Sequence, residues 1–330
     1  MGMNAMHERR VRGYKRRDGA ATVDTLDDLL DRTLARLGDT SSPAHLAATL
    51  ATFLDSLDAL RNAHDGSRWR ELIARCRSHA LHELLVREDP YTRRAFLKPR
   101  GYAGDAEMLD YVYSGKAGTS MTLRGSALFR ALAWESHASH AVRVRQDVLA
   151  WMVDEVAARK SRPRVLSLAC GHLREADLAE SVRAARVDYM AVDQDSESLF
   201  EVERRLGLRG VKVKNASVRD VLRREVTFSG FDLVYAAGLY DYLVPDVARR
   251  LTEILFEAVA PGGRLLVANF VPDHPGRAYM EAFMDWSLVY RTHDELQMLA
   301  AGIDARAIDE SRVFQLEPCV AYLELTRARS

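Results

Sequence analysis

The sequence predicts a doubly wound α/β fold, in which a mostly parallel sheet follows an all-α N-terminal region. From residue 164 onward, short apolar runs alternate with helix-like segments. In residues 164–178 (RVLSLACGHLREADL), one apolar run stops at a Cys–Gly pair before a helix-like segment. A second apolar run ends in an acid, Asp193, about 20 residues further on. This strand, glycine turn, helix, strand and acid are the parts with which such folds hold nucleotide-like ligands.

Composition narrows the class of protein. The chain has 330 residues, enough for one large or two modest domains, and 47 basic residues balance 47 acidic ones. A net charge of zero argues against nucleic acid as the main partner. The three cysteines, Cys76, Cys170 and Cys319, are far apart, which fits reduced thiols in a cytoplasm and gives no metal-ligand spacing. No apolar run approaches the ~18 residues of a membrane span.

The N-terminal segment is basic and has no apolar core. Six basic residues fall within residues 9–17, without the apolar run of a secretory signal. We expect a disordered basic tail over residues 1–20; an arm that binds nucleic acid or membrane is the less favoured alternative.

The first third of the chain predicts helices. Leucines and other apolar residues recur with the 3.6-residue period over residues 25–37, 43–60 and 69–86, with Ser42 and Pro43 as N-cap and first turn of the second helix. Residues 89–120 are rich in glycine, tyrosine and basic residues, so we expect a loop with one short helix at residues 106–113. A further helix is expected over residues 128–153.

The rest predicts a mostly parallel sheet. Strands are expected at residues 164–168, 187–192, 211–214, 231–236 and 263–270, and helical segments between them indicate βαβ units. An insertion (residues 271–291) and a Thr-capped helix (292–301) follow. Two strands, residues 305–311 and 319–326, predict a terminal hairpin that adds an antiparallel strand.

The glycine spacing disfavours a dinucleotide. The positions that match G-x-G-x-x-G are Ala169, Gly171 and Arg174. An arginine at the third position would block the close helix–strand packing that a glycine permits. An NAD-type oxidoreductase is therefore the less favoured alternative.

From residue 164 to the C-terminus, the chain resembles the class I S-adenosylmethionine-dependent methyltransferases. The acid and alternate glycines of that family's first motif correspond to Ser167, Ala169, Gly171 and Leu173, so one glycine remains. Asp193, NASV (215–218), FDLV (231–234) and APGGR (260–264) follow in the family's order. The resemblance implies a seven-stranded methyltransferase-type Rossmann sheet, S-adenosylmethionine as cofactor, and Asp193 on the ribose hydroxyls. The implied cofactor-binding residues are Ala169, Cys170, Gly171, Asp193, Gln194, Ser217, Val218, Ala237, Arg100 and Tyr102.

The segment after the fourth strand, AAGLYDY, is where the methyl group would be transferred. We expect Tyr240 and Asp241 as catalytic candidates; the alternatives are a helix cap for Asp241 and a core position for the tyrosine. Two segments suit a lid or an acceptor site: KPRGYAGD (98–105), with two cations that could clamp a carboxylate, and the aromatic DWSLVYR (285–291). The substrate-binding candidates are Lys98, Asp105, Tyr242, Arg277, Trp286, Tyr290 and Arg291.

A narrower resemblance joins LKPRGYAGDAEML, VLSLACG, AAGLYDYL and FMDWSLVYR. It is to bacterial methyltransferases with a helical N-terminal region, some of them makers of 3-hydroxypalmitic acid methyl ester. We expect a helical N-terminal and lid region over residues 21–125 and an S-adenosylmethionine-binding domain over 126–330. The narrower resemblance implies O-methylation of a carboxylate or hydroxyl of a small molecule, as in natural-product biosynthesis. N-methylation and a non-catalytic binding module remain alternatives. His172 and His274 lie near predicted strand ends and are the candidates for a general base, although a plain loop role is favoured for both.

Overall fold

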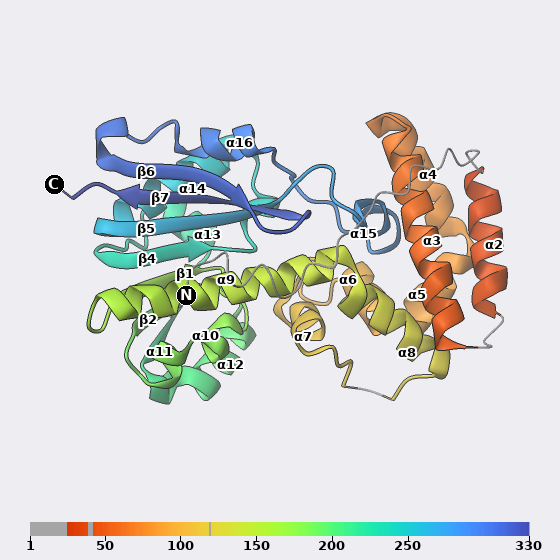
Figure 1. Cartoon of the computed structure of the whole chain (residues 1–330), viewed down its shortest axis with the longest axis horizontal. Helices are drawn as coiled ribbons and strands as arrows, with labels where there is room; N and C mark the ends of the chain where they lie inside the picture. Colours follow the sequence, from red (N-terminus) through yellow and green to blue (C-terminus); the bar gives the residue numbers. More distant parts are fainter. Residues whose placement is uncertain (1–24, 39–41, 119, 330) are drawn as a thin grey trace.

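The structure is a computed structural model that describes residues 25–38, 42–118 and 120–329. A sheet with its helices occupies one end of the molecule, and a helical bundle occupies the other (Figure 1). The long helix α9 (His137–Arg159) runs from the bundle to the sheet. The expected disordered tail lies outside the described residues.

The bundle consists of short helices with buried leucine faces. The helices expected at residues 25–37 and 43–60 are confirmed, and Ser42 Oγ accepts the His45 N–H at the start of the second. The short helix expected at residues 106–113 is also confirmed. The helices are α2 (Leu26–Gly38), α3 (Pro43–Asn62), α4 (Gly66–Ser78), α5 (Ala80–Glu88), α6 (Pro90–Leu97), α7 (Ala106–Ser114) and α8 (Leu123–Phe129).

Two helix boundaries differ from the prediction. The helix expected at residues 69–86 is divided at His79, whose backbone is extended and whose Nδ1 accepts the Leu81 N–H to cap α5. The loop expected from residue 89 begins with a helix, because Asp89 accepts the amides of Tyr91 and Thr92 and Pro90 occupies the first turn. α6 therefore begins at Pro90, inside the segment expected to be a loop.

The helix expected at residues 128–153 is also broken. A π-helical turn (Arg130–Glu135) follows α8, and α9 begins after Ser136. Ser136 Oγ donates to Leu132 O (2.7 Å) and accepts the Ser139 N–H (3.3 Å). One hydroxyl thus hydrogen-bonds a backbone carbonyl at the end of one helix and a backbone amide at the start of the next. The periodicity of apolar residues does not reveal such a break.

The sheet confirms the predicted fold class. Its strand order is β3-β2-β1-β4-β5-β7-β6, and β7 runs antiparallel to both of its neighbours. β5 begins earlier than expected, so the Pro–Gly–Gly segment lies in the strand beside an irregular register with β4. The strands are β1 (Arg164–Leu168), β2 (Asp188–Asp193), β3 (Val211–Asn215), β4 (Phe231–Ala236), β5 (Val259–Phe270), β6 (Ile308–Gln315) and β7 (Val320–Arg327).

Helices cover both faces of the sheet, and two hydrophobic clusters lie on its two sides. This explains why β1 and β4 are buried almost throughout. The covering helices besides α9 are α10 (Glu175–Leu178), α11 (Glu180–Arg183), α12 (Ser196–Leu206), α13 (Val218–Leu222), α14 (Pro245–Ala258) and α16 (His293–Gln297). Within the described ranges, no helix is long and apolar enough to cross a membrane.

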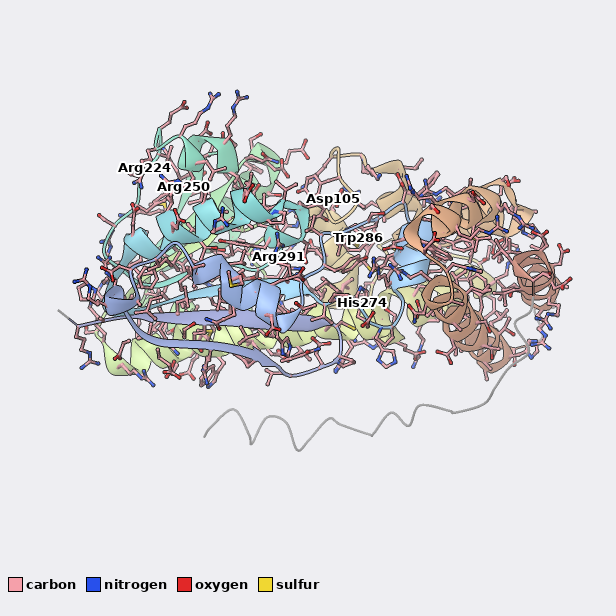
Figure 2. All side chains as sticks on the ribbon, turned by 90° about the horizontal axis from the view of Figure 1, so that it is seen from above. Asp105, Arg224, Arg250, His274, Trp286 and Arg291 are labelled. Carbon is pink, nitrogen blue, oxygen red and sulfur yellow. The ribbon has the colours of Figure 1, made fainter. Side chains whose placement is uncertain are left out.

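Helix α15 (Arg277–Phe283), from the insertion after β5, joins the two ends of the molecule. It packs against α3 and α4, beside the labelled His274 and Trp286 (Figure 2). Asp58 of α3 accepts the amides of Gly276 (2.6 Å) and Ala278 (3.0 Å). Trp69 of α4 donates to Glu281 of α15 (2.7 Å). The bundle is thereby fixed over the carboxyl ends of the strands.

Candidate cofactor and substrate site

A cavity of about 470 Å³ lies at the carboxyl ends of β1, β2 and β4, covered by the loop between α6 and α7. This is the edge at which doubly wound sheets bind ligands. Nine of the ten residues expected to hold the cofactor line it: Ala169, Cys170, Gly171, Asp193, Gln194, Val218, Ala237, Arg100 and Tyr102.

The loop after β1 has a left-handed backbone at alternate residues. Ala169, Gly171 and Leu173 have φ angles of 55°, 52° and 50°. These are the three positions at which the resembled family alternates glycines, and a side chain there costs about 1–2 kcal/mol. A Cβ added to Gly171 would lie 3.3 Å from the Ala106 Cβ. The loop therefore keeps the glycine-type conformation where two glycines are missing, which is strain stored at a ligand site.

Asp193 ends β2 and is 6% exposed. Its Oδ2 accepts the Gly171 N–H (2.8 Å) and its Oδ1 accepts the Asp195 N–H (2.9 Å). Burial raises its pKa, while these two backbone hydrogen bonds oppose the rise. Each carboxylate oxygen can accept two hydrogen bonds, so each retains one position for a ligand hydroxyl. The cap of the following helix α12 is Asp195, so Asp193 is not engaged as a helix cap.

The segment after β3 contributes Ala216 and Val218 to the cavity. Ser217, between them, was expected to hold the cofactor and does not line it. Its hydroxyl accepts the Asp220 N–H (3.2 Å), and Asp220 accepts the Ser217 N–H (2.8 Å), which forms a capping box at the start of α13. The two apolar residues Ala216 and Val218 thus line the cavity, while the serine between them begins a helix.

The lid loop (residues 98–104) is fastened on both sides of the cavity. Arg100 donates to Asp195 Oδ2 (2.8 Å) and Ser198 Oγ (3.1 Å) on the β2 side. At its other end, a Cβ on Gly104 would lie 2.6 Å from the Tyr242 hydroxyl and 2.8 Å from Trp286. Trp286 Nε1 donates to the Tyr242 hydroxyl (2.9 Å). The loop therefore lies over the mouth of the cavity, held by an ion pair and by close packing.

Two buried charged residues that the sequence motifs did not indicate also line the cavity. Arg145 of α9 is 4% exposed and donates to Ala237 O (2.6 Å). Glu175, at the start of α10, is 7% exposed, and its Oε1 accepts the Tyr235 hydroxyl (2.6 Å). Tyr113 also lines the cavity. The sequence feature that could have identified Arg145 is its position on the apolar face of α9, between Val142 and Val148, where a charged residue is unusual.

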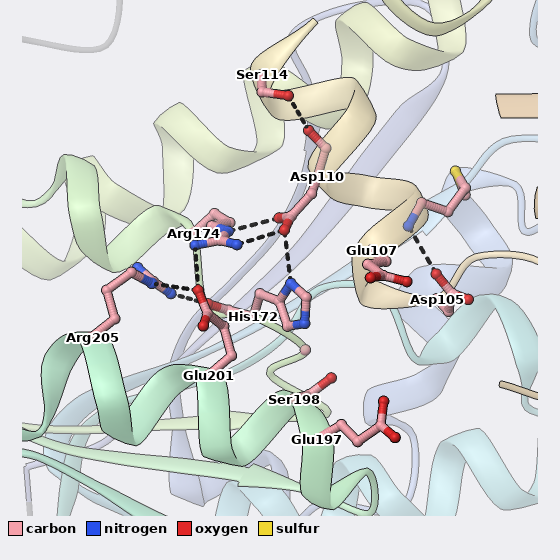
Figure 3. Close-up of polar contacts among 12 residues, drawn as sticks. Asp105, Glu107, Asp110, Ser114, His172, Arg174, Glu197, Ser198, Glu201 and Arg205 are labelled. Carbon is pink, nitrogen blue, oxygen red and sulfur yellow. Dashed lines mark hydrogen bonds and ion pairs between the residues drawn. The ribbon is translucent and has the colours of Figure 1, made fainter. Parts of the chain in front are cut away.

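His172 lines the cavity and is oriented by a carboxylate (Figure 3). Its Nδ1 lies 2.8 Å from Asp110 Oδ2, and Arg174 Nε donates to Asp110 Oδ1 (2.7 Å). Burial disfavours the charge of Asp110, but hydrogen bonds from Arg174 and His172 prevail and lower its pKa to about 2. Arg174, which departs from the dinucleotide pattern, thus serves to hold Asp110 ionised beside the imidazole.

The two catalytic candidates lie outside the cavity lining. Tyr240 is fully buried, and its hydroxyl lies 3.0 Å from Thr252 Oγ1 of α14. Asp241 is 3% exposed and accepts the Phe270 N–H (2.7 Å), and burial raises its pKa to about 6. The 3-10 turn Tyr240–Tyr242 directs Tyr242 to the cavity and the other two inward. The catalytic role of this pair stays a prediction, whereas the helix-cap alternative for Asp241 is wrong, since Val244 precedes α14.

Of the seven substrate-binding candidates, Tyr242 lines the cavity and Trp286 supports it. The buried Asp105 caps α7 and binds Arg94 Nε (2.8 Å). Arg291 donates to Tyr240 O (2.7 Å). The other three have these partners: Lys98 binds Asp285, Arg277 binds Glu281 (2.7 Å), and Tyr290 lies under the Arg277 guanidinium (3.9 Å).

His274, the second base candidate, is buried away from the cavity lining, and its burial lowers its pKa to about 4. In the described part of the chain, no three His, Cys, Asp or Glu side chains gather as metal ligands. The three cysteines are buried free thiols.

No protein-family model and no curated protein matches the chain. Among solved structures, it is similar to a possible exported protein from Bordetella parapertussis, with 15% identity over 94% of this chain and 99% of that one and a TM-score of 0.55. Weaker likenesses include the N-methyltransferase NodS from Bradyrhizobium japonicum with S-adenosyl-L-homocysteine (13% identity, 56% and 87% covered, TM-score 0.41). Another is a TehB-like methyltransferase from Corynebacterium glutamicum, with 13% identity over 54% of this chain and 86% of that one and a TM-score of 0.38. At these identities a likeness concerns the fold, and the strand order with its reversed β7 defines it: the chain has the seven-stranded methyltransferase-type Rossmann fold.

Proposed function

We propose that this chain is an S-adenosylmethionine-dependent methyltransferase that acts on a small molecule. The observation that carries the proposal is the carboxylate of Asp193, at the end of β2 in the cavity lining. Two backbone amides, those of Gly171 and Asp195, orient it. Two accepting positions remain, which is the number that the two hydroxyls of a ribose require.

The residues around Asp193 fit the rest of an adenosyl cofactor. Ala216 and Val218 offer an apolar surface for adenine beside the ribose position. Gly171, where a Cβ would narrow the gap to α7, lets the loop after β1 come close to the ligand. The cofactor, when bound, supplies a methyl group already activated by the sulfonium.

The chain then has two tasks, alignment and exclusion of water. Ala237 and Tyr242, after β4, line the cavity where an acceptor would meet the methyl group. The lid loop closes over it through Arg100 and Gly104. Alignment of two reactants in such a site supplies about 7–11 kcal/mol of the barrier reduction.

For the acceptor we propose a carboxylate or hydroxyl oxygen. Leu109, Leu149 and Leu239 make part of the lining apolar, which supports a hydrophobic acid or alcohol such as the narrower resemblance implies. A carboxylate is ionised at neutral pH and needs no base. A hydroxyl would require one, and His172, held by Asp110, is the group in the lining that suits this role.

The location and partners follow from the same proposal. Three buried free thiols support a cytoplasmic location. A chain with balanced charge supports a small-molecule partner over nucleic acid.

Calorimetric titration with S-adenosylhomocysteine tests the ribose site. Asp193→Ala removes two charge-assisted hydrogen bonds to the ligand, so we expect affinity to fall at least tenfold. The matched control is Asp154→Ala, because Asp154 also accepts two backbone amides, those of Glu180 (3.0 Å) and Ser181 (2.7 Å), outside the cavity lining. We expect its affinity to change less than twofold.

Unchanged affinity in Asp193→Ala contradicts the ribose assignment, and absence of binding to the unaltered protein contradicts the proposed function. Turnover is followed with a radiolabelled methyl group on a panel of acids, alcohols and amines. A product whose label is released by base is an ester and identifies a carboxylate acceptor, whereas a base-stable label indicates an ether or an amine. Cofactor binding without turnover on the whole panel favours a non-catalytic module.

A further inference from the structure

Tyr242 belongs both to the lining of the cavity and to the surface of the molecule. It follows β4 and is 39% exposed, and Val244, two residues further on, is 57% exposed. The other tyrosines of the lining, Tyr102, Tyr113 and Tyr235, are half-buried or buried. Tyr242 therefore stands where the cavity meets the surface, on the β4 side.

The hydroxyl of Tyr242 is held inside the protein. Trp286 Nε1 donates to it (2.9 Å), and the Gly104 backbone also hydrogen-bonds it. Burial raises the pKa of this hydroxyl, which agrees with its inward position. A Cβ on Gly104 would lie 2.6 Å from it, so the lid loop approaches as closely as glycine allows. Two hydrogen bonds thus hold the Tyr242 ring across this side of the cavity.

The position of Trp286 is fixed through the residue before it. Asp285 accepts Arg77 Nη2 of α4 (2.7 Å) and also binds Lys98 at the start of the lid loop. Lys98 and Asp285 both have left-handed backbones, with φ angles of 49° and 48°. This conformation is unfavourable for a residue with a side chain, and the surrounding ion pairs offset its cost. Trp286 is thereby presented to Tyr242 from a rigid support.

The lid loop is fastened separately on the β2 side. There Arg100 donates to Asp195 and Ser198, which follow β2. Tyr242 follows β4, and β1 lies between the two strands in the sheet. Two strand spacings correspond to about 10 Å. The two fastenings use different residues, so one can open while the other stays closed.

We propose that Tyr242 is the door of a separate acceptor entrance on the β4 side of the cavity. It opens when the Tyr242 ring turns away from Trp286, while Arg100 keeps the lid loop over the cofactor. The inference rests on the proposed function. It separates the two exchanges of the reaction, because the acceptor can enter and its methylated product leave without release of the cofactor.

The chemistry of the entrance indicates which acceptors it admits. The Tyr102 and Tyr242 rings meet edge to face, with their centroids 6.2 Å apart. The charged side chains next to Trp286 are already paired, since Asp285 binds both Lys98 and Arg77. Aromatic rings beside paired charges favour an apolar or aromatic body over an ionic one. Tyr242 therefore selects acceptors whose body, apart from the reacting group, is apolar or aromatic.

Thiol labelling measures passage through the entrance without knowledge of the acceptor. Ala237→Cys places a thiol in the lining after β4, and the three natural thiols are buried. This variant, saturated with S-adenosylhomocysteine, is treated with benzyl methanethiosulfonate, a flat apolar reagent. Mass spectrometry of the peptide that contains position 237 gives the labelling rate. If Ala237→Cys lowers affinity for S-adenosylhomocysteine, Leu239→Cys, also in the lining, replaces it.

With the introduced thiol present, Trp286→Phe should speed labelling about fivefold, because one of the two hydrogen bonds on the door is lost. Tyr242→Phe loses both and keeps the ring, so we expect about tenfold or more. Adding Trp286→Phe to Tyr242→Phe should change the rate by less than about twofold, since both remove the same contact. Arg100→Met should leave labelling within about twofold, although it speeds release of S-adenosylhomocysteine.

Stopped-flow release of S-adenosylhomocysteine gives the complementary measurement. Trp286→Phe should leave the release rate within about twofold of the unaltered protein, because the Arg100 fastening is intact. Trp69→Phe is the matched control: Trp69 is also a buried indole, and its Nε1 donates to Glu281 (2.7 Å) outside the cavity lining. Neither labelling nor release should change in it, which separates opening of the door from general loosening.

Variants that change labelling and release together would show that the lid opens as one body, and they would overturn the separate entrance. Unchanged labelling in both Trp286→Phe and Tyr242→Phe would overturn it as well. The anionic reagent 2-sulfonatoethyl methanethiosulfonate tests the acceptor class: an equal gain in its labelling rate would overturn the preference for an apolar body. If the unaltered protein does not bind S-adenosylhomocysteine, the proposed function is overturned, and labelling of the ligand-free protein still tests the door.

Discussion

Replacement of Asp241 by asparagine is expected to stabilise the protein at neutral and alkaline pH. Asp241 is 3% exposed, and its Oδ1 accepts the Phe270 N–H at 2.7 Å. Burial raises its pKa from 3.8 to about 6, although Phe270 N–H, Arg145 and Arg291 each lower it. The folded protein therefore binds this proton more tightly than the unfolded chain does. Its contribution to stability is greatest below pH 4 and falls as the pH rises to 6.

The size of the effect follows from the shift. About two pKa units at about 1.4 kcal/mol each amount to roughly 3 kcal/mol, the cost of keeping the carboxylate ionised in the folded state above pH 6. The amide of the asparagine variant would keep an oxygen to accept the Phe270 N–H and would carry no charge. We expect Asp241→Asn to be about 1–3 kcal/mol more stable than the unaltered protein at pH 8, with the difference vanishing near pH 4.

Urea denaturation at pH 4, 6 and 8 measures this difference, with S-adenosylhomocysteine titrations in parallel. We expect affinity within twofold of the unaltered protein, because Asp241 does not line the cavity. A variant less stable at pH 8 refutes the reasoning from burial. Loss of methyl transfer in a stable, ligand-binding variant would support the catalytic role that the sequence suggested.

Three further predictions concern the cavity and its lid. Arg100→Met removes the partly exposed ion pair with Asp195, which contributes about 1 kcal/mol. Stopped-flow measurements should therefore show S-adenosylhomocysteine dissociating about fivefold faster. An unchanged dissociation rate contradicts the role of this ion pair in holding the lid loop closed. Gly104→Val should weaken binding of the same ligand by about 1–3 kcal/mol, because the valine side chain would overlap Trp286. Gly66→Ala is the neutral control, since a Cβ at Gly66 has nothing within 4 Å. Equal calorimetric affinities of the Gly104→Val variant and the unaltered protein argue against close packing of the lid loop. Asp110→Asn should lower the free energy of unfolding by about 2 kcal/mol at pH 7, since the pKa of Asp110 is lowered from 3.8 to about 2 in the folded protein. This loss of stability should shrink as the pH falls from 4 toward 2. A loss that does not depend on pH in urea denaturation would show that the shape of the side chain, and not its charge, stabilises the fold there.

Much of the fold followed from local patterns. The strand runs of β1 and β4 were predicted to the residue, and the terminal hairpin predicted the reversed β7. Buried parallel strands are continuous apolar runs, so their period and length identify them. The helix breaks at His79 and Ser136 were missed, because a side-chain cap at an extended residue leaves the apolar periodicity intact.

The cofactor end of the site was predictable for a similar reason. Residues that directly follow strands β1, β2 and β4 must lie at one edge of a parallel sheet, whatever the distant contacts are. Ala169, Asp193 and Ala237 are of this kind, and all three line the cavity. Ser217 does not line the cavity, and its hydroxyl forms a capping box with Asp220, a local hydrogen bond that the sequence motif does not reveal.

The sequence by itself determined the order of strands and helices, the turn after β1 and the acid after β2, because each depends on neighbours in the chain. Tertiary structure decided which polar side chains face the ligand. Asp241 and Arg291 were directed into the core, while Arg145 and Glu175, distant in sequence, were brought to one wall through the packing of α9 against α10. The segment RVLSLACGHL, strand β1 and the turn after it, shows both levels. Its order along the chain predicted a ligand-binding turn, but its left-handed backbone at Ala169 and Leu173 persists because the surrounding packing offsets the strain.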